Sequence, residues 1–237
     1  SDLQTMSNLV GSETLTLTGN STISDANVGT KTVNTGGFTL NDQAGANASS
    51  GGLASNYILS GGTHQLVINQ RPLNATLARQ YDGTTASAGS TLSAFDALQG
   101  GETLTLSGSG TAASANVANG ISVSSLGTLA LVNGTGAASN YSLNSTVINV
   151  TQRPISLSGT RLYDATTNAI ASDLSTHANL VGSQTLSLSG TGSVANANVG
   201  NNKTVTVGTL ALADGSNGGL AANYTLSGGT HQLTVNQ

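Results

Sequence analysis

The stretch GSETLTL at residues 11–17 decides the fold, because versions of it occur three times in the chain. It returns as GGETLTL at 100–106 and as GSQTLSL at 182–188. In each copy polar residues alternate with leucines, which is typical of a β-strand with one buried and one exposed face. Two further motifs recur in step with it, Asn-Tyr at 56–57, 140–141 and 223–224, and Arg-Pro at 71–72 and 153–154. Tandem copies of a unit of about 82 residues indicate a repeat array.

The recurrence divides the chain into three parts, named here repeat 1 (1–70), repeat 2 (71–152) and repeat 3 (153–237). Repeat 1 has no counterpart of residues 71–89, so either it lacks its first strand or the physical boundary is shifted and the last repeat is incomplete. Both interpretations predict that the chain belongs to a longer array. The Gln-Arg-Pro stretches at 70–72 and 152–154 are the predicted joints, since proline fixes φ there.

The composition predicts a folded protein with a neutral surface. Of 237 residues, 37% are hydrophobic, 3% aromatic and 7% charged, and the net charge is −4. Each repeat is large enough for one modest core of Leu, Val, Ile and Ala. No basic stripe is present, which argues against a nucleic-acid partner, and no apolar run approaches the roughly 20 residues of a membrane span. The absence of cysteine excludes disulfides and thiolate metal sites.

Alternating segments such as KTVTV at 203–207 and LTV at 233–235, separated by Gly-Ser, Asn-Gly and Gly-Gly turns, predict an all-β fold. We expect tandem small β-sandwich (Ig-like) modules in an elongated array. A β-solenoid is the alternative, although no period near 20 residues supports it. One segment of each repeat departs from the alternation and predicts a short helix with a serine N-cap (Ser1, Ser90 or Ser172), on apolar positions spaced by three: Leu3, Met6, Leu9; Leu92, Phe95, Leu98; Leu174, His177, Leu180.

The same motifs resemble a known family. Arg-Pro at 71–72 and 153–154, YDGTT at 81–85, ANVGTKTV at 26–33 and ANYTL at 222–226 resemble the YDG-type repeats of very large bacterial surface and secreted adhesins, including filamentous-haemagglutinin-like exoproteins. The resemblance implies a β-rich stalk or display module on an exported protein, without an active site. Two departures are Ala165, which replaces the glycine of YDG, and the ANG sequence at 118–120.

The residues with reactive side chains predict no catalytic, cofactor-binding or metal-binding residue, and no enzyme. His64 and His231 occupy equivalent positions and are predicted to be exposed on a strand, whereas His177 is predicted to pack at the core edge. The acidic side chains of repeat 2 (Asp82, Asp96, Glu102) and the polar ones of repeat 3 (Asp164, Asp173, Gln184) form no calcium-binding pattern. Asp82 and Asp164 are instead predicted to cap backbone N–H groups in tight turns.

Tyrosine and lysine positions carry structural predictions. Tyr57, Tyr141 and Tyr224 are predicted to pack inward and hydrogen-bond the backbone across a corner. Tyr81 and Tyr163 are predicted to fill the other end of the core. Lys31 and Lys203 occur at equivalent positions and are interpreted as solvated charges at a strand edge rather than as partners of an isopeptide bond.

These observations predict a non-catalytic stalk or spacer of an exported bacterial adhesin, which projects a distal binding region from the cell surface. The alternative is that the repeats themselves bind glycans, matrix or copies of themselves in a biofilm or filament. The expected location is extracellular or at the bacterial cell surface. The expected partners are neighbouring repeats of the same array, with neither nucleic acid nor membrane insertion.

Overall fold

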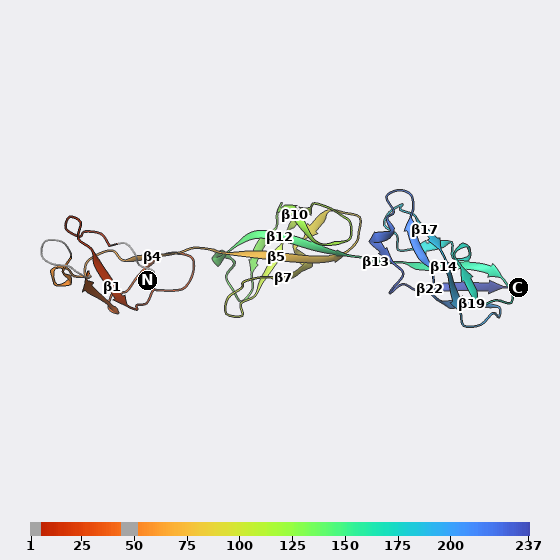
Figure 1. Ribbon diagram of the computed structural model, residues 1–237, viewed down its shortest axis with the longest axis horizontal. Helices are drawn as coiled ribbons and strands as arrows, with labels where there is room; N and C mark the ends of the chain where they lie inside the picture. Colours follow the sequence, from red (N-terminus) through yellow and green to blue (C-terminus); the bar gives the residue numbers. More distant parts are fainter. Residues whose placement is uncertain (1–5, 44–51) are drawn as a thin grey trace. The chain divides into compact units, whose positions relative to one another are not determined.

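The computed structural model describes residues 6–43 and 52–237 (Figure 1). Within these ranges the protein is all-β: strands are joined by turns and by five three-residue 3-10 turns, and no α-helix is present. The chain forms two compact units. The first comprises Ser1–Pro72 with Gly136–Ser142, and the second comprises Leu73–Thr135 with Leu143–Gln237.

Repeat 2 is built on a six-stranded sheet in the order β6-β9-β10-β12-β5-β7, with a separate antiparallel pair, β8 and β11. The first and last strands of the repeat, β5 and β12, are neighbours in the middle of this sheet. The strand bounds are β5 Arg71–Gln80, β6 Ala86–Ala88, β7 Leu92–Phe95, β8 Leu104–Ser107, β9 Ser109–Ala112, β10 Ala118–Ser125, β11 Ala130–Asn133 and β12 Tyr141–Thr151, with 3-10 turns η2 Gly89–Thr91 and η3 Ala138–Asn140.

Repeat 3 has the same topology, with its sheet in the order β15-β18-β19-β22-β14-β16 and a separate pair, β17 and β20. β14 and β22 run parallel, with Leu157 opposite His231. A short parallel contact, β13 with β21, precedes them. The bounds are β13 Arg153–Pro154, β14 Ser156–Leu162, β15 Asn168–Ile170, β16 Thr176–Ala178, β17 Leu186–Ser189, β18 Thr191–Val194, β19 Gly200–Thr206, β20 Ala211–Asp214, β21 Tyr224–Thr225 and β22 His231–Asn236, with η4 Ala171–Asp173 and η5 Ala221–Asn223.

Repeat 1 contains part of this topology. β1 (Leu15–Gly19) pairs with β3 (Phe38–Asp42), as β8 pairs with β11, and β2 (Gly29–Thr32) pairs with β4 (Gln65–Ile68), as β10 pairs with β12. The 3-10 turn η1 (Ala54–Asn56) precedes β4. Among the described residues of repeat 1 there is no equivalent of β5 and β6, which matches the missing counterpart of residues 71–89.

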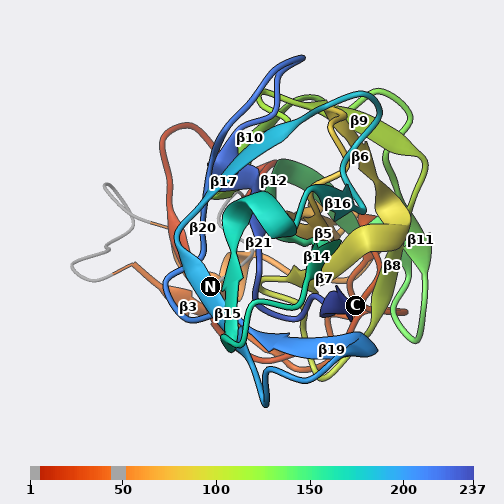
Figure 2. The ribbon, with the colours of Figure 1, turned by 90° about the vertical axis from the view of Figure 1, so that its right-hand side faces the viewer.

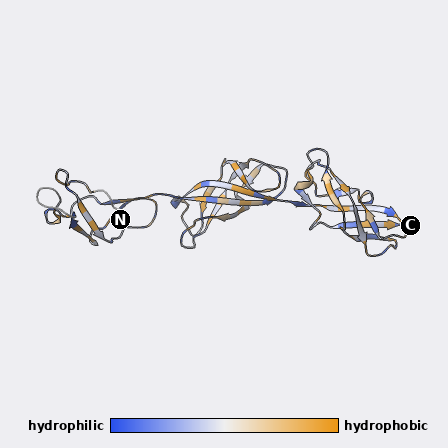
Figure 3. Cartoon of the chain, in the orientation of Figure 1, coloured by the Kyte–Doolittle hydropathy of each residue, from blue (hydrophilic) through white to orange (hydrophobic). Residues whose placement is uncertain are grey.

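The alternating leucines face the interior, as predicted. Leu104 and Leu106 are buried, and Leu157 and Leu233 on the central strands of repeat 3 are fully buried. Figure 3 shows the hydrophobic positions along the strands. The buried cluster contains residues of both repeat 2 and repeat 3, including Tyr81 and Tyr224, so the core of one repeat is not closed off from that of the next. Strand pairing nevertheless stays within each repeat in the two six-stranded sheets.

The predicted helix is wrong. Residues 92–95 form β7, in which Phe95 lies opposite Ala75 of β5, and residues 176–178 form β16 at the edge of the sheet beside β14. A 3-10 turn comes just before each strand, η2 in repeat 2 and η4 in repeat 3. A single 3-10 turn followed by an edge strand places apolar residues about three apart, and the sheet supplies the backbone partners that a helix would have had to supply itself. In repeat 1, Met6 lies outside any strand or turn element, and Ser1 and Leu3 lie outside the described residues.

Candidate docking interface between repeats

Each repeat carries an Asn-Tyr corner, defined here as the 3-10 turn η1, η3 or η5 with the tyrosine that follows it (54–57, 138–141 and 221–224). In repeat 3 the Val181 N–H donates to Tyr224 Oη at 3.0 Å, and this hydroxyl donates to Gln184 Oε1 at 2.5 Å. In repeat 1 the Val10 N–H donates to Tyr57 Oη at 2.9 Å, and Glu13 accepts from the same hydroxyl. The predicted backbone hydrogen bond is therefore confirmed at Tyr57 and Tyr224, and the predicted inward packing at Tyr141 and Tyr224, which are buried; Tyr57 is only partly buried.

These bonds leave the tyrosine hydroxyls in different electrostatic surroundings. Burial, the largest influence, raises the pKa of Tyr224, and the neighbouring Tyr81 acts in the same direction. The pKa of Tyr57 is raised chiefly by its hydrogen bond to the Glu13 carboxylate. Both tyrosines remain neutral donors and act as fixed structural groups of the corner.

Each repeat also carries an Asn-Val loop, defined here as residues 25–28, 114–117 and 196–199. The first side chain of each loop accepts a hydrogen bond from the N–H two residues on, which closes an Asx- or Ser-type turn. The bonds are Asn27 N–H to Asp25 Oδ1 at 2.9 Å, Asn116 N–H to Ser114 Oγ at 3.1 Å and Asn198 N–H to Asn196 Oδ1 at 3.2 Å. The three loops therefore share one shape although their first residues differ.

The two lysines hold these loops. Lys31 Nζ lies 2.6 Å from Asp25 Oδ1, and this bond is the largest cause that lowers the pKa of Asp25 to about 2. Lys203 Nζ donates to the carbonyl and side-chain oxygens of Asn196 and to the carbonyl of Asn198. The prediction that these lysines are solvated charges at a strand edge is wrong, because a loop folds over each ammonium group. Repeat 2 has the buried Ile121 at this position.

The Asn-Val loop of repeat 2 binds the Asn-Tyr corner of repeat 3 through one asparagine. The Val117 N–H donates to Asn223 Oδ1 at 2.9 Å, and Asn223 Nδ2 donates to Asn116 Oδ1 at 3.0 Å. The Asn223 side chain is buried, with 1% of its surface exposed. Gln152 Nε2 adds a bond to the Ala222 carbonyl at 3.2 Å. A buried amide with donor and acceptor both paired is specific, since neither bond can be lost without an unsatisfied polar group.

The same three bonds occur a second time, within the first compact unit. The Val28 N–H donates to Asn140 Oδ1 at 2.9 Å, and Asn140 Nδ2 donates to Asn27 Oδ1 at 2.9 Å. Gln70 Nε2 donates to the Ser139 carbonyl at 3.1 Å. The Asn-Val loop and the Gln of one repeat thus contact the Asn-Tyr corner of the following repeat in the same way in both cases.

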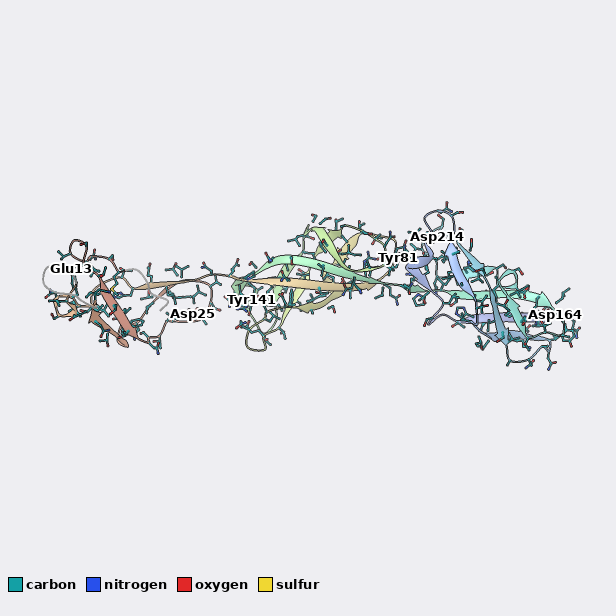
Figure 4. The ribbon with its side chains drawn as sticks, in the orientation of Figure 1. Glu13, Asp25, Tyr81, Tyr141, Asp164 and Asp214 are labelled. Atoms are coloured by element: carbon teal, nitrogen blue, oxygen red, sulfur yellow. The ribbon has the colours of Figure 1, made fainter. Side chains whose placement is uncertain are left out.

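Tyr81 completes the interface in the second compact unit. It is 3% exposed, and its ring meets the Tyr224 ring edge to face, with centroids 5.4 Å apart and planes at 81°. Gln184 Nε2 donates to Tyr81 Oη at 2.9 Å, and Arg153 Nη1 donates to the Tyr81 carbonyl at 3.4 Å. Figure 4 shows Tyr81 at the end of repeat 2 that faces repeat 3. Tyr81 is part of the buried cluster, as predicted, but residues of repeat 3 complete its burial.

A family model matches repeats 2 and 3. The YDG domain model matches residues 69–148 and 149–232. The chain belongs to the YDG domain family. No curated protein and no solved structure matches the chain. Each matched range contains one Asn-Val loop, one Asn-Tyr corner and one Tyr-Asp turn, defined here as residues 81–84 and 163–166. The interface described above is therefore built from parts that both YDG domains possess.

The Tyr-Asp turn of each YDG domain is fixed by its aspartate, as predicted. Asp82 Oδ1 accepts the Thr84 N–H at 2.9 Å and Asp164 Oδ1 accepts the Thr166 N–H at 2.9 Å, while Arg79 and Arg161 pair with the two carboxylates. Burial, the largest influence, raises the pKa of Asp82, but the bonds from Thr84 and the charge of Arg79 outweigh it, so the net direction is down. The Thr166 N–H bond is the largest cause that lowers the pKa of Asp164.

Gly83 allows the first YDG domain to approach the second closely. Its φ is +76°, and a Cβ at this position would lie 2.8 Å from Val181 Cγ1. The second YDG domain has Ala165 here, also at positive φ (+63°). An L-residue with a Cβ is strained in this region, so the backbone conformation of Ala165 is less favourable in free energy than that of a glycine would be.

Tyr163 does not follow the prediction made for it. Tyr163 is 52% exposed, and its neighbour Leu162 is 69% exposed. Val199, the valine of the third Asn-Val loop, is 49% exposed, whereas Val28 and Val117 are partly buried. Tyr81 is buried by Tyr224 of the following domain, so a tyrosine at this position is covered by its neighbour rather than by its own core. The prediction that Tyr163 fills a core is wrong for this reason.

The histidines occupy structural positions. His231 was predicted to be exposed, but it is buried: the Leu157 N–H donates to Nδ1 at 3.3 Å, so Nε2 carries the proton and donates to the Leu226 carbonyl at 2.8 Å. His64 is partly buried, with Nε2 2.6 Å from the Leu59 carbonyl. His177 is partly buried at the core edge, as predicted, and burial is the main cause that lowers its pKa.

Residues 6–43 and 52–237 contain no group of three or more His, Cys, Asp or Glu side chains arranged to hold a metal ion. They contain no helix long and apolar enough to cross a membrane. A shallow open groove of about 360 Å³ lies beside the last Asn-Tyr corner, lined mainly by aliphatic side chains that include Leu210, Leu212 and Leu226. It contains no charged group.

The sequence pointed to the recurring Asn-Tyr motif but not to what its asparagine binds. The signal was present, because an Asn-Val pair recurs ahead of each Asn-Tyr pair.

Proposed function

We propose that this chain is a non-catalytic segment of a repeat array, which serves as a stalk or spacer of an exported bacterial adhesin at the cell surface and projects a distal binding region. We further propose that each repeat is an Ig-like β-sandwich and that the repeats form an elongated array. The observation that carries the proposal is the recurrence of one interface: the same three hydrogen bonds, from an Asn-Val loop and a Gln to an Asn-Tyr corner, occur twice.

A repeated specific contact supports a mechanical role. A flexible linker would leave the orientation of consecutive repeats free. Here a buried asparagine, an aromatic pair and an arginine that bonds Tyr81 O and Asn179 O restrict the second compact unit at its internal joint. Repetition of such a joint gives a quasi-one-dimensional structure in which reach grows with the number of repeats.

The use of charge supports the same proposal. Arg79 and Asp82, Arg161 and Asp164, and Lys31 and Asp25 form ion pairs within their own repeats, at turns and loops. These groups shape the interface instead of converging on a substrate. The remaining surface is mainly Ser, Thr, Asn and Gly, which suits an exposed spacer that resists aggregation.

Small-angle X-ray scattering of the chain tests the proposal. Three domains of about 30 Å each in a row give a maximum dimension of at least about 90 Å and an asymmetric pair-distance distribution. A single symmetric peak with the dimension of one globule of this mass would refute the spacer role.

The groove beside Tyr224 favours a second candidate, a binding module for glycan, matrix or another copy of the chain. A glycan array and binding to immobilised matrix proteins test it. Saturable binding that is lost on Leu212→Asp, a change in the wall of the groove, would establish the binding role in place of the spacer role.

A further inference from the structure

We propose that the exposed end of repeat 3, formed by the Tyr163 turn and the Asn-Val loop 196–199, is a docking site for the Asn-Tyr corner of a further YDG domain. The inference rests on the proposed array and deepens it, because it names the residues that recognise the partner. The occupant is defined by chemistry already seen twice in this chain: an asparagine amide followed by an inward tyrosine.

The loop that would receive the corner already has its bound shape. In repeat 2 the loop that holds Asn223 is closed by the Asn116 N–H bond to Ser114. In repeat 3 the equivalent bond from Asn198 N–H to Asn196 is formed although no corner is bound, and Lys203 adds three bonds across the loop. A loop that is ordered before binding loses little conformational entropy when its partner arrives.

The turn that would cover the aromatic pair is also formed. Asp164 accepts the Thr166 N–H and pairs with Arg161, as Asp82 does with Thr84 and Arg79. The Tyr163 N–H donates to the Asn236 carbonyl at 2.9 Å, as the Tyr81 N–H does to the Thr151 carbonyl at 2.9 Å. The backbone therefore places Tyr163 as it places Tyr81. Figure 2 views the molecule from this end, with β15, β19 and the C-terminus in view.

Apolar exposure at this end indicates a missing partner. Leu162, Tyr163, Ile170 and Val199 are all substantially exposed. The equivalent residues of repeat 2 are Gln80, Tyr81, Ala88 and Val117. Gln80 is exposed but polar, Tyr81 is buried, and Ala88 and Val117 are partly buried. An apolar group of this kind at the rim of a preformed polar loop is typical of an interaction surface.

Repeat 1 shows an Asn-Tyr corner whose asparagine is not buried. In repeat 1 the Asn-Tyr corner is complete, with Tyr57 held by Val10 and Glu13, while Asn56 is exposed. Asn56 is equivalent to Asn140 and Asn223, each of which forms two side-chain hydrogen bonds with an Asn-Val loop. The corner of repeat 1 is thus formed with its asparagine exposed.

Ala165 sets a specificity for the partner. At the occupied interface Gly83 faces Val181, with no room for a Cβ. The Ala165 Cβ would meet the residue at the Val181 position of an incoming domain. Repeat 2 has the unbranched and flexible Gln99 at that position, so the site on repeat 3 accepts a corner like that of repeat 2 more readily than one like its own.

The test extends the full chain by one domain. Gln237 stands where Gln70 and Gln152 stand, so a second copy of residues 71–152 fused directly after Gln237 is in register. Amide hydrogen exchange is measured at Val199 in the chain with and without the added copy. We expect exchange to slow by at least roughly tenfold on fusion, because a buried amide bond of this kind opens only when the interface opens.

Two matched variants decide the result. Asn140→Ala in the added copy removes the recognising amide and is expected to return Val199 to the rate of the unfused chain. Ala165→Gly is expected to slow Val199 exchange further when the added copy is residues 153–237, which presents Val181. Slow exchange of the core amides of the added copy shows that the copy is folded. If the 71–152 copy does not fold, the experiment uses an added copy of 153–237, with Asn223→Ala as its variant.

Unchanged exchange at Val199 beside a folded added domain would overturn the inference, as would protection that survives the loss of the asparagine. Neither result bears on the spacer role, which scattering tests separately: an extended chain with unprotected Val199 would keep the spacer and reject the docking site.

Discussion

Tyr81 and Tyr163 occupy the same position in the two YDG domains and begin turns of the same construction, but one is 3% exposed and the other 52% exposed. The difference comes from what stands next to them. Tyr81 meets Tyr224 and Gln184 of the following domain, whereas Tyr163 has no following domain in the described structure. The burial of Tyr81 therefore depends on the domain that follows it.

The largest expected effect comes from removing the two tyrosines in turn. Tyr81→Ala deletes a buried ring and its edge-to-face contact and should lower the free energy of unfolding by about 3 kcal/mol or more. Tyr163→Ala should lower it by less than about 1 kcal/mol, because this ring is half in water. Urea denaturation monitored by circular dichroism measures both values. Equal losses for the two variants would show that burial of Tyr81 by the next domain contributes nothing.

The asparagine of the corner gives the next largest effect. Asn223→Ala removes a buried amide and both of its hydrogen bonds, to the partly buried Val117 N–H and to the Asn116 side chain, which should cost about 2 kcal/mol. Asn56→Ala changes the same residue of an exposed corner, and its expected cost is within about 0.5 kcal/mol. Thermal unfolding of both variants checks this pair, and a stability loss in Asn56→Ala as large as in Asn223→Ala would contradict the account.

Exchanging the turn residues sharpens the comparison further. Gly83→Ala places a residue at φ +76° and a Cβ against Val181, so we expect a loss of about 1–2 kcal/mol. Ala165→Gly relieves the positive φ at the exposed end and should stabilise the chain by up to about 1 kcal/mol. Chemical denaturation of the two variants measures the change in the free energy of unfolding and its sign. A stabilising Gly83→Ala would mean that the two domains do not approach as closely as described.

The smallest effect is a pH dependence carried by His177. Burial lowers its pKa below the ordinary value of 6.5, so the folded protein holds this proton less tightly than the unfolded chain does. Its contribution to stability is complete above about pH 6.5 and is lost as the pH falls below that value. His177→Phe, which copies Phe95 of repeat 2, should remove this dependence. Unfolding curves between about pH 7.5 and pH 5 should therefore separate the two proteins progressively, and parallel curves would refute the assignment.

The sequence was sufficient for the strands and the order of the motifs. The leucines at 104, 106, 186 and 233 alternate with polar residues, and the structure buries them on strands as that alternation predicts. The helix prediction failed because a spacing of three fits both a helical turn and a 3-10 turn followed by an edge strand. Only the pairing of β16 with β14, a contact distant in sequence, distinguishes them.

The interface could be predicted only in part. The aspartate caps could be predicted from the sequence, since Asp82 and Asp164 act on the N–H groups of their own turns. Sequence analysis did not identify the roles of Lys203, His231 and Asn223, because each depends on a segment brought close by the fold: the loop over the ammonium group, β14 beside β22, and the preceding domain. Burial of a residue by a neighbouring domain leaves no pattern in the sequence around that residue.

Amide hydrogen exchange at the three valines of the Asn-Val loops tests the central claim most directly. If an Asn-Tyr corner binds the loop ahead of it, the Val28 and Val117 N–H groups exchange slowly, Val199 exchanges at close to the rate of an exposed amide, and Asn223→Ala brings Val117 to the rate of Val199. Equal rates at all three valines in the unaltered chain would contradict it.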